Sequence, residues 1–297
     1  MIGDFVYVNG KYLDKDDAKI SVFDHNFVYG DGVFEGLQLS GGLIFKLREH
    51  IDRLFKSCRF LQIDLPFSRE EFIHIICETA SLNKLRDGYM RPIISRGVGP
   101  TGIRNMHQLK GPTVVVIAQH EDINKKAAIF ASGYRAIVSS YRRVPPDSLD
   151  SRVKTCNYIN NILAYLEAKH AGADTAIMLD HTGYLAEGYG SNIFAVTDGI
   201  VRTPSEGNIL AGITRATLLG ACKDLGIEAR ETRMTLYDLM TADEVFESAS
   251  MMEIAPIVSI TGTRIGGGQV GPITRKLHEA LRGEMAKQEN GVKVTYR

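Results

Sequence analysis

Tight turns between short strands are the feature that most constrains the fold of this 297-residue chain. Asn9-Gly10 lies within the alternating stretch FVYVNGKYL, and Gly41-Gly42 lies within QLSGGLIFKL. Two further hairpins are predicted to turn at 180–183 and at Asp198-Gly199. Turns of this kind join neighbouring antiparallel strands. We therefore predict a mixed α+β and α/β fold with largely antiparallel sheets, in preference to a doubly wound parallel sheet.

Helical periodicity alternates with these hairpins. Ser68 and Glu71 form a capping box, which predicts that a helix begins there. Gly226 is suited to end a helix. Apolar residues at helical spacing predict further helices over 48–61, about 155–170, about 213–225 and 273–288.

The length of the chain predicts two domains, because it exceeds what one hydrophobic core usually supports. We expect a smaller α+β domain over 1–120 and a larger domain over 129–297. The polar segment 121–128, which follows the strand TVVVIAQ, is interpreted as the linker.

The composition excludes several classes of function. Lys plus Arg and Asp plus Glu both number 35, so no basic surface suggests nucleic acid as a partner. The eight histidines do not have metal-ligand spacing, and no apolar run is long enough to predict a membrane span. The N-terminus lacks the pattern of a signal peptide, and the four cysteines are widely spaced. We therefore expect a cytoplasmic protein with reduced thiols and no metal.

Two motifs indicate the chemistry. In EGYGSNIF, a carboxylate at Glu187 precedes a glycine-rich turn and a strand, and in LAGITR a glycine precedes the helix start at Ile213 and Thr214. The first turn of a helix attracts phosphate through its N–H groups and its dipole. A carboxylate and a phosphate site are half of what a pyridoxal phosphate enzyme requires. Lys154 and Arg53 are candidates for the lysine and the cation that complete the set.

These motifs carry a resemblance to the branched-chain and D-amino-acid aminotransferases, the fold type IV pyridoxal phosphate enzymes. The resemblance covers nearly the whole chain, through markers in the following order: YGDGVFEG, HIDRL, YMRP, KTCNYINNILA, EGYGSNIF, LAGITR and EVFESASMMEIAPI. It implies two domains of the D-amino-acid aminotransferase-like fold, with the cofactor at the domain interface. It also implies transfer of the amino group of branched-chain L-amino acids to 2-oxoglutarate by a homodimer or higher homo-oligomer.

The resemblance assigns roles at the cofactor. It makes Lys154 the catalytic Schiff-base lysine and places Glu187 at the pyridine nitrogen, Arg53 at the phosphate and Tyr158 at the phenolic oxygen. Three further residues are implied to bind the phosphate: Ile213, Thr214 and Ser250. The residues alone leave other interpretations open. Lys154 and Arg53 could be solvated surface residues, Glu187 could be an exposed turn residue, and Tyr158 could be a core residue. Tyr158 lies four residues after Lys154, one turn along the expected helix, so both side chains can face one pocket.

The resemblance also assigns residues to the substrate. Four first-domain side chains are implied to shape its pocket: Tyr29, Phe34, Tyr89 and Arg91. Backbone N–H groups of the turn that contains Met251 and Met252 are implied to bind the substrate α-carboxylate. We expect Arg91 to meet the second carboxylate of glutamate, and part of the wall to come from the partner subunit.

Other interpretations remain. D-amino-acid aminotransferase and aminodeoxychorismate lyase lie within the resembled group, but YMRP favours the branched-chain type, and Thr101 and Ile103 stand near the positions where D-specific enzymes have arginine and histidine. A regulatory protein without catalysis is disfavoured by the presence of both Lys154 and Glu187. GVGPTG over 97–102 is too close to the next strand for a dinucleotide-binding crossover and is expected to be a loop near the substrate. The chain departs from the resembled family at two points. It has Tyr189 where the family usually has a small residue, and it has no tryptophan.

Overall fold

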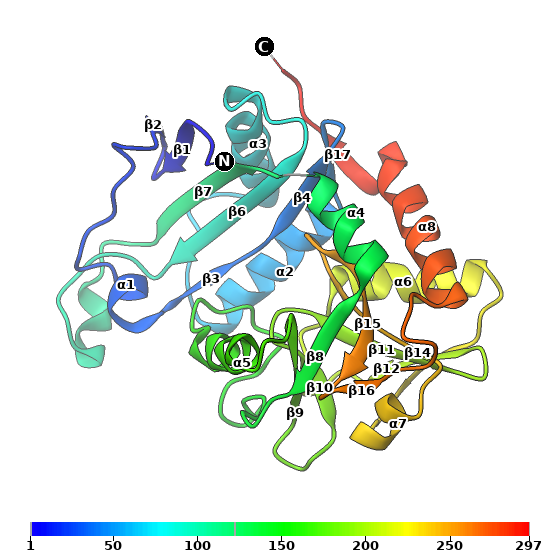
Figure 1. Cartoon of the computed structure of the whole chain (residues 1–297). Coiled ribbons are helices and arrows are strands. Elements are labelled where there is room, and N and C mark those ends of the chain that lie inside the picture. The colour runs from blue at the N-terminus through cyan, green and yellow to red at the C-terminus, as the bar shows by residue number, and fades with distance from the viewer. Residues whose placement is uncertain (1, 122, 297) are drawn as a thin grey trace. The chain divides into compact units, whose positions relative to one another are not determined.

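The computed structural model describes residues 2–121 and 123–296. The chain forms two compact units (Figure 1). The first unit contains Met1–Asp122, Val153–Tyr158 and Met285–Arg297, and the second contains Ile123–Arg152 and Ile159–Glu284. The division differs from the expected one because a short segment around Lys154 and the C-terminal segment both belong to the first unit.

The sheet of the first unit has eight strands, and all its pairs are antiparallel. Its order is β17 (Gly291–Lys293), β5 (Leu43–Phe45), β4 (Leu37–Ser40), β6 (Gly88–Ser95), β7 (Thr113–His120), β1 (Phe5–Val8) and β2 (Lys11–Asp14), with β3 (Gly32–Phe34) also pairing with β6. The C-terminal β17 explains why the last residues join this unit, since they extend its sheet beside β5.

The two hairpin turns predicted in the first unit are confirmed. Asn9 and Gly10 have φ values of 46° and 89°, and Gly41 and Gly42 have φ values of 57° and 82°. Positive φ at both central residues is the geometry of the two-residue turns that match the twist of antiparallel strands.

The core of the first unit lies between its sheet and two helices, α2 (Leu47–Phe60) and α3 (Arg69–Leu82). α2 contributes Ile51, Leu54 and Cys58 to this core, as its periodicity predicted. α3 begins at the predicted capping box of Ser68 and Glu71. The remaining helices of this unit are short: α1 (His25–Tyr29), η1 (Ile103–Gln108) and η2 (Gln288–Asn290).

The sheet of the second unit has nine strands and is mixed. Its order is β10 (Leu185–Gly188), β9 (Thr175–Leu179), β8 (Tyr134–Val138), β15 (Glu253–Ile260), β14 (Glu244–Ala249), β11 (Asn192–Thr197), β12 (Ile200–Pro204) and β13 (Ala229–Thr232), with β16 (Thr263–Arg264) on β15. Three pairs are parallel, β8 with β9, β8 with β15, and β12 with β13, and the other pairs are antiparallel. The predicted mixed fold with largely antiparallel sheets is therefore confirmed.

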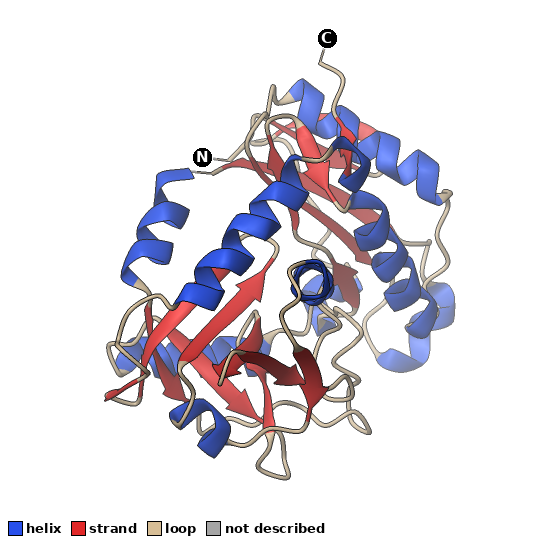
Figure 2. Ribbon diagram, turned by 90° about the vertical axis from the view of Figure 1, so that its right-hand side faces the viewer, coloured by secondary structure: helices blue, strands red, loops and turns tan. Residues whose placement is uncertain are grey.

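The helices of the second unit are α4 (Ile123–Ser132), α5 (Ile159–His170), α6 (Ile213–Asp224), α7 (Leu236–Met240) and α8 (Pro272–Ala286), which Figure 1 labels. Figure 2 draws the helices of the chain in blue and its strands in red. α6 and α8 lie close to their predicted bounds. Two predictions differ from the structure: much of the expected linker 121–128 belongs to α4, and α5 begins at Ile159 rather than near 155.

Three further findings concern the described residues only. None of their helices combines the length and apolarity needed to cross a membrane. Their His, Cys, Asp and Glu side chains form no cluster of three suited to a metal ion. The four cysteines are not joined by disulfide bonds.

Candidate active site

Lys154 lies in a non-helical segment of the first unit, beside β3, where Thr155 N–H donates to the Val153 carbonyl at 2.9 Å. Phe34 N–H donates to the Lys154 carbonyl at 3.1 Å, and Cys156 N–H donates to the Gly32 carbonyl at 2.8 Å. These bonds hold the backbone on both sides of Lys154 and explain why the predicted helix starts later. The expectation that Lys154 and Tyr158 are one helical turn apart is wrong.

The side chains of Lys154 and Tyr158 nevertheless meet. Lys154 Nζ donates to the Tyr158 hydroxyl at 3.4 Å and lies 4.7 Å from the centre of the Phe34 ring. The Phe34 and Tyr158 rings contact edge to face at 5.2 Å. The contact therefore forms without a helical turn between the two residues.

Arg91 and Tyr89 form a second polar group beside Phe34. Arg91 Nε donates to the Tyr89 hydroxyl at 2.5 Å, and the guanidinium lies 4.5 Å from the centre of the Phe34 ring. Burial raises the pKa of Tyr89, and the neighbouring Arg91 partly opposes that rise. Phe34 therefore contacts both the Lys154 amine and the Arg91 cation.

Tyr29 is placed elsewhere in the first unit, at the end of α1. It is 40% exposed, and its hydroxyl accepts a hydrogen bond from Gly102 N–H at 2.6 Å. Its ring contacts His25 edge to face. Tyr29 is thus joined to the 97–102 loop rather than to the group around Phe34.

Arg53 is held by a buried carboxylate that the sequence analysis did not identify. Its Nε and Nη2 donate to Glu35 Oε1 and Oε2, each at 2.7 Å, and His50 Nδ1 lies 2.7 Å from Oε2. Burial opposes the charge on Glu35, but Arg53 and His50 outweigh it and hold the pKa of this carboxyl well below its usual value. Arg53 is 14% exposed, so its alternative reading as a solvated arginine does not apply.

Glu187 lies at the end of β10 and is 4% exposed. Its Oε1 accepts from Arg143 Nε at 2.7 Å, and its Oε2 accepts from Leu210 N–H at 2.8 Å and from Asn192 Nδ2 at 3.4 Å. The alternative reading as an exposed turn glutamate is therefore excluded. Three donors stabilise the charged carboxylate and fix its orientation.

The helix start at Ile213 and Thr214 is tied to the same carboxylate. Asn192 Nδ2 also donates to the Leu210 carbonyl at 3.0 Å, and a Cβ at Gly212 would lie 1.9 Å from Asn192 Oδ1. Gly212 is the N-cap of α6 and makes no side-chain cap bond. The first amides of this helix are therefore suited to receive an anion.

Ser250, Met251 and Met252 form the turn between β14 and β15 and are half-buried. The next residue, Glu253, has φ of 63°, which is unusual for a side chain of this size. Its carboxylate lies 3.4 Å from Lys126 Nζ and 3.3 Å from His278 Nε2. These contacts fix the position of Glu253, the first residue after the turn.

Tyr189 turns toward α5 in the second unit. Its ring lies 4.9 Å from that of Tyr165 and packs on the cluster that contains Ala164 and Met178. Its carbonyl accepts from Asn161 Nδ2 at 2.6 Å. The bulky residue at this position therefore joins the turn after Glu187 to α5.

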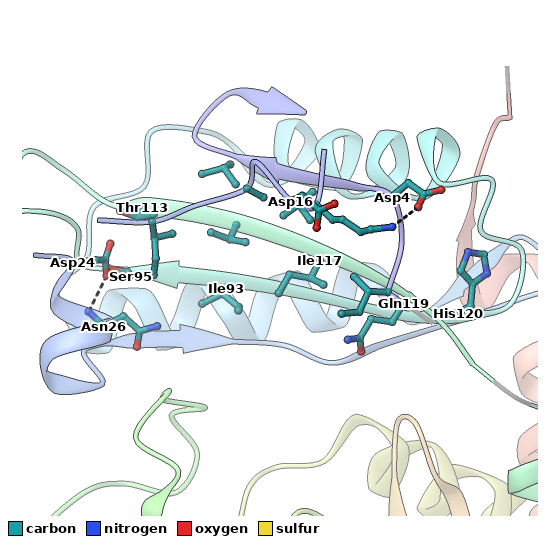
Figure 3. Close-up of a pocket in the computed structure, with 17 residues that line it drawn as sticks. Asp4, Asp16, Asp24, Asn26, Ile93, Ser95, Thr113, Ile117, Gln119 and His120 are labelled. Carbon is teal, nitrogen blue, oxygen red and sulfur yellow. Dashed lines mark hydrogen bonds and ion pairs between the residues drawn. The ribbon is translucent and has the colours of Figure 1, made fainter. Parts of the chain in front are cut away.

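A cavity of about 840 Å³ lies in the first unit (Figure 3). Its wall includes Ile93 on β6 and Ile117 on β7, and Asp24 and Asn26 lie at one end. Alternation along β6 places Ile93 on the same face as Tyr89 and Arg91. Among the described residues, the lining set does not include the predicted catalytic or cofactor-binding residues.

Comparison with known proteins identifies the family. The model of the amino-transferase class IV family matches residues 32–260, and the chain belongs to this family. A protein of Methanocaldococcus jannaschii that bears the provisional name branched-chain-amino-acid aminotransferase is 44% identical over 97% of this chain and 98% of its own length. The branched-chain-amino-acid aminotransferase of Escherichia coli is 34% identical over 94% of this chain and 92% of its own length.

Solved structures agree with this assignment. The T.th. branched-chain amino acid aminotransferase with pyridoxamine 5′-phosphate has a TM-score of 0.93 at 34% identity, covering 99% of this chain and 98% of that chain. The Escherichia coli branched-chain amino acid aminotransferase has a TM-score of 0.90 at 32% identity and covers 96% of both chains. The predicted aminotransferase fold is therefore confirmed.

Proposed function

We propose that this chain is a pyridoxal phosphate-dependent branched-chain-amino-acid aminotransferase. It transfers the amino group of leucine, isoleucine or valine, in the L form, to 2-oxoglutarate. The observation that carries the proposal is the contact of Lys154 Nζ with the Tyr158 hydroxyl at 3.4 Å, beside the aromatic ring of Phe34. This contact gives a lysine amine a defined place among groups that suit a cofactor and a substrate.

The residues of the second unit fit the cofactor. The Arg143 bond to Glu187 Oε1 leaves acceptor capacity on that oxygen for a protonated ring nitrogen. Ile213 and Thr214, at the start of α6, would bind the phosphate through backbone N–H groups, and Ser250 would add its hydroxyl. When bound, pyridoxal phosphate supplies an electron sink for the charge that develops at the substrate Cα.

The residues of the first unit act on the substrate and the phosphate. Lys154 Nζ would take the proton from the substrate Cα as a general base and donate it to C4′ of the cofactor as a general acid. Tyr158 holds this amine and hydrogen-bonds the cofactor's phenolic oxygen. Arg53, oriented by its two bonds to Glu35, binds the phosphate as a guanidinium fork.

The two substrates share one pocket, which needs an apolar wall and one cation. Phe34 contacts both Lys154 and Arg91, so an aliphatic side chain held near Lys154 would meet its ring. The second carboxylate of glutamate would instead meet Arg91, whose orientation Tyr89 sets. Backbone N–H groups of the turn at Met251 and Met252 would bind the α-carboxylate. Tyr29 lies apart from Phe34 in the same chain, so it would contribute to the wall from a second copy of the chain.

We also propose a homodimer. The cavity beside β6 and β7 is rimmed by exposed apolar side chains, including Ile2 at 59% and Ile20 at 47% exposure. Large exposed apolar surface is typical of an interaction site. This face continues to Arg91, so a second copy seated on it would complete the wall of the substrate pocket. A cytoplasmic location stays a prediction.

An amino-donor panel tests the proposed activity. The purified enzyme is incubated with 2-oxoglutarate and single L- or D-amino acids, and the glutamate formed is measured. L-leucine, L-isoleucine and L-valine should be the best donors. Preference for D-donors would establish a D-amino-acid aminotransferase, and release of pyruvate from aminodeoxychorismate would establish the lyase; either result would overturn the proposal.

A further inference from the structure

A buried carboxyl group lies behind the turn that follows Glu187. Glu247, on β14, is 1% exposed. Its Oε2 accepts hydrogen bonds from Thr175 Oγ1 at 3.0 Å and from Ser191 Oγ at 2.7 Å. Buried carboxyl groups usually pair with a cation, whereas these two partners are neutral hydroxyl groups. The Glu247 carboxyl group is buried and hydrogen-bonded to two hydroxyl groups. This arrangement indicates a role in hydrogen bonding rather than in packing.

Glu247 connects three parts of the second unit. Thr175 begins β9, Ser191 immediately precedes β11, and Ile193 of β11 lies opposite Glu247 in the β11–β14 ladder. One carboxyl group therefore joins the turn between β10 and β11 to the two strands behind it.

The turn itself is closed by a backbone hydrogen bond to Ser191. Gly188 N–H donates to the Ser191 carbonyl at 2.8 Å. A Cβ at Gly188 would lie 2.1 Å from Ser191 Oγ and 3.0 Å from Glu247 Oε2, so the space beside this glycine is already used. Glu187 precedes Gly188, and Asn192, which follows Ser191, contacts Glu187. A shift of Ser191 would therefore move residues on both sides of the Glu187 carboxylate.

The surroundings of Glu247 are weakly charged. Burial raises the pKa of Glu247 to about 7, although its bonds with Ser191 and Thr175 oppose the rise. The titratable groups that face it are Tyr134 of β8 and Tyr189 of the turn, and burial raises the pKa of both phenols to about 12. The phenols therefore remain neutral across the range in which the carboxyl titrates.

We propose that Glu247 is a positioning residue for Glu187, because its carboxyl group holds the Gly188–Ser191 turn through the Ser191 hydroxyl. The inference rests on the proposed function, in which Glu187 faces the cofactor ring. Glu247 itself touches neither substrate nor cofactor in this account.

The test compares Glu247→Leu, Glu247→Gln and Ser191→Ala with the unchanged holoenzyme. Glu244→Gln is the matched control, because Glu244 is also a buried carboxylate of β14 and accepts from the Thr274 hydroxyl, at the end of the strand away from the turn. The readouts are the absorption spectrum of the bound cofactor against pH, amide hydrogen exchange of the peptide over 185–192, and kcat and KM for leucine. Ser191→Ala removes one hydroxyl and serves if Glu247→Leu fails to fold.

Glu247→Leu and Ser191→Ala should each lower kcat by about tenfold with little change in KM, the equivalent of one lost hydrogen bond. Both should shift the spectral titration and speed exchange over 185–192, whereas Glu247→Gln, which keeps an acceptor, should recover most of the loss. Normal spectrum, exchange and kcat in Ser191→Ala would overturn the proposal, as would a Glu247→Gln variant no better than Glu247→Leu. If the unchanged protein has neither cofactor absorption nor turnover, the proposed function is wrong. In that case, hydrogen exchange over 185–192 alone tests whether Glu247 holds the turn.

Discussion

The backbone N–H of Leu210 donates a hydrogen bond to Oε2 of Glu187 at 2.8 Å. This bond joins the two motifs of the second unit that are separated by 23 positions. Because Leu210 lies just before the start of α6, the bond fixes the carboxylate relative to the helix amides. The groups expected at the ring nitrogen and at the phosphate therefore form one rigid arrangement.

Glu187→Gln should lower turnover by orders of magnitude, because it removes the charge that keeps the ring nitrogen protonated but retains the shape. Each ~1.4 kcal/mol of lost transition-state stabilisation is about a tenfold loss of rate. The measurement is kcat with leucine and 2-oxoglutarate. Glu228→Gln, at an exposed carboxylate of the same unit, is the control and should behave as the unchanged enzyme. An equal rate for both variants would count against the role of Glu187.

Arg91→Ala should impair glutamate and 2-oxoglutarate far more than leucine. The charge-assisted bond to the second carboxylate is lost, and such bonds contribute about 1.5–3 kcal/mol, or roughly 10- to 100-fold in kcat/KM. The measurement is kcat/KM for each substrate separately.

Tyr89→Phe is the matched control for Arg91, because it removes the hydroxyl that accepts from Arg91 Nε and keeps the ring. It should reduce the discrimination between the two substrate classes without abolishing it. Equal losses for leucine and glutamate in Arg91→Ala would mean that this arginine is structural.

Glu35→Gln should destabilise the protein at neutral pH by about 3 kcal/mol, because it leaves Arg53 without its buried partner. The folded pKa of Glu35 lies below the ordinary value of 4.5, so its contribution to stability is present above pH 4.5 and is lost as the pH falls below that value. The difference in unfolding free energy between the two proteins should therefore shrink on acidification. Urea unfolding from pH 7 to pH 3.5 measures it.

Glu70→Gln is the control for Glu35, since Glu70 pairs with Arg48 on the exposed surface. Its stability should follow that of the unchanged protein across the same pH range. A Glu35→Gln difference that is independent of pH would contradict the assignment of the charged form to Glu35. Weaker retention of cofactor is also expected, because Arg53 loses its orientation.

If the chain forms the proposed dimer, Ile20→Glu should convert that dimer to a monomer and lower activity with it, because it places a charge on the rim of the cavity in Figure 3. Light scattering after size-exclusion chromatography gives the mass. Phe60→Glu, at a 58% exposed apolar residue outside the cavity, should remain dimeric. A monomeric but fully active enzyme would contradict a partner contribution to the substrate pocket.

Much of the fold could be predicted because its signals are local. Asn9-Gly10 and Asp198-Gly199 specify hairpins through their own backbone preferences, and Ser68 with Glu71 specifies a helix start. The return of β17 to β5 could not be predicted, since strand pairing across some 250 positions leaves no local signal. The backbone bonds between β3 and the Lys154 segment escaped prediction for the same reason.

The sequence predicted which residues belong to the candidate site, but it did not predict the residues that hold them in place. Glu35, Arg143 and Asn192 were missed because each acts on a predicted residue that is distant in sequence. His50 had a usable signal, since it precedes Arg53 by three positions on one helix. Glu247 had none, because its hydroxyl partners come from two other strands or turns.

Borohydride reduction followed by peptide mass spectrometry tests the central claim most directly, because it reports which amine is bonded to the cofactor. In the resting enzyme the adduct should be on the peptide that contains Lys154. Prior incubation with L-leucine should release this lysine and abolish the adduct, and 2-oxoglutarate should restore it, while D-leucine should leave it unchanged. Lys154→Ala should lack the adduct and turnover but retain some cofactor. An adduct on another lysine, or one that L-leucine does not affect, would contradict the account.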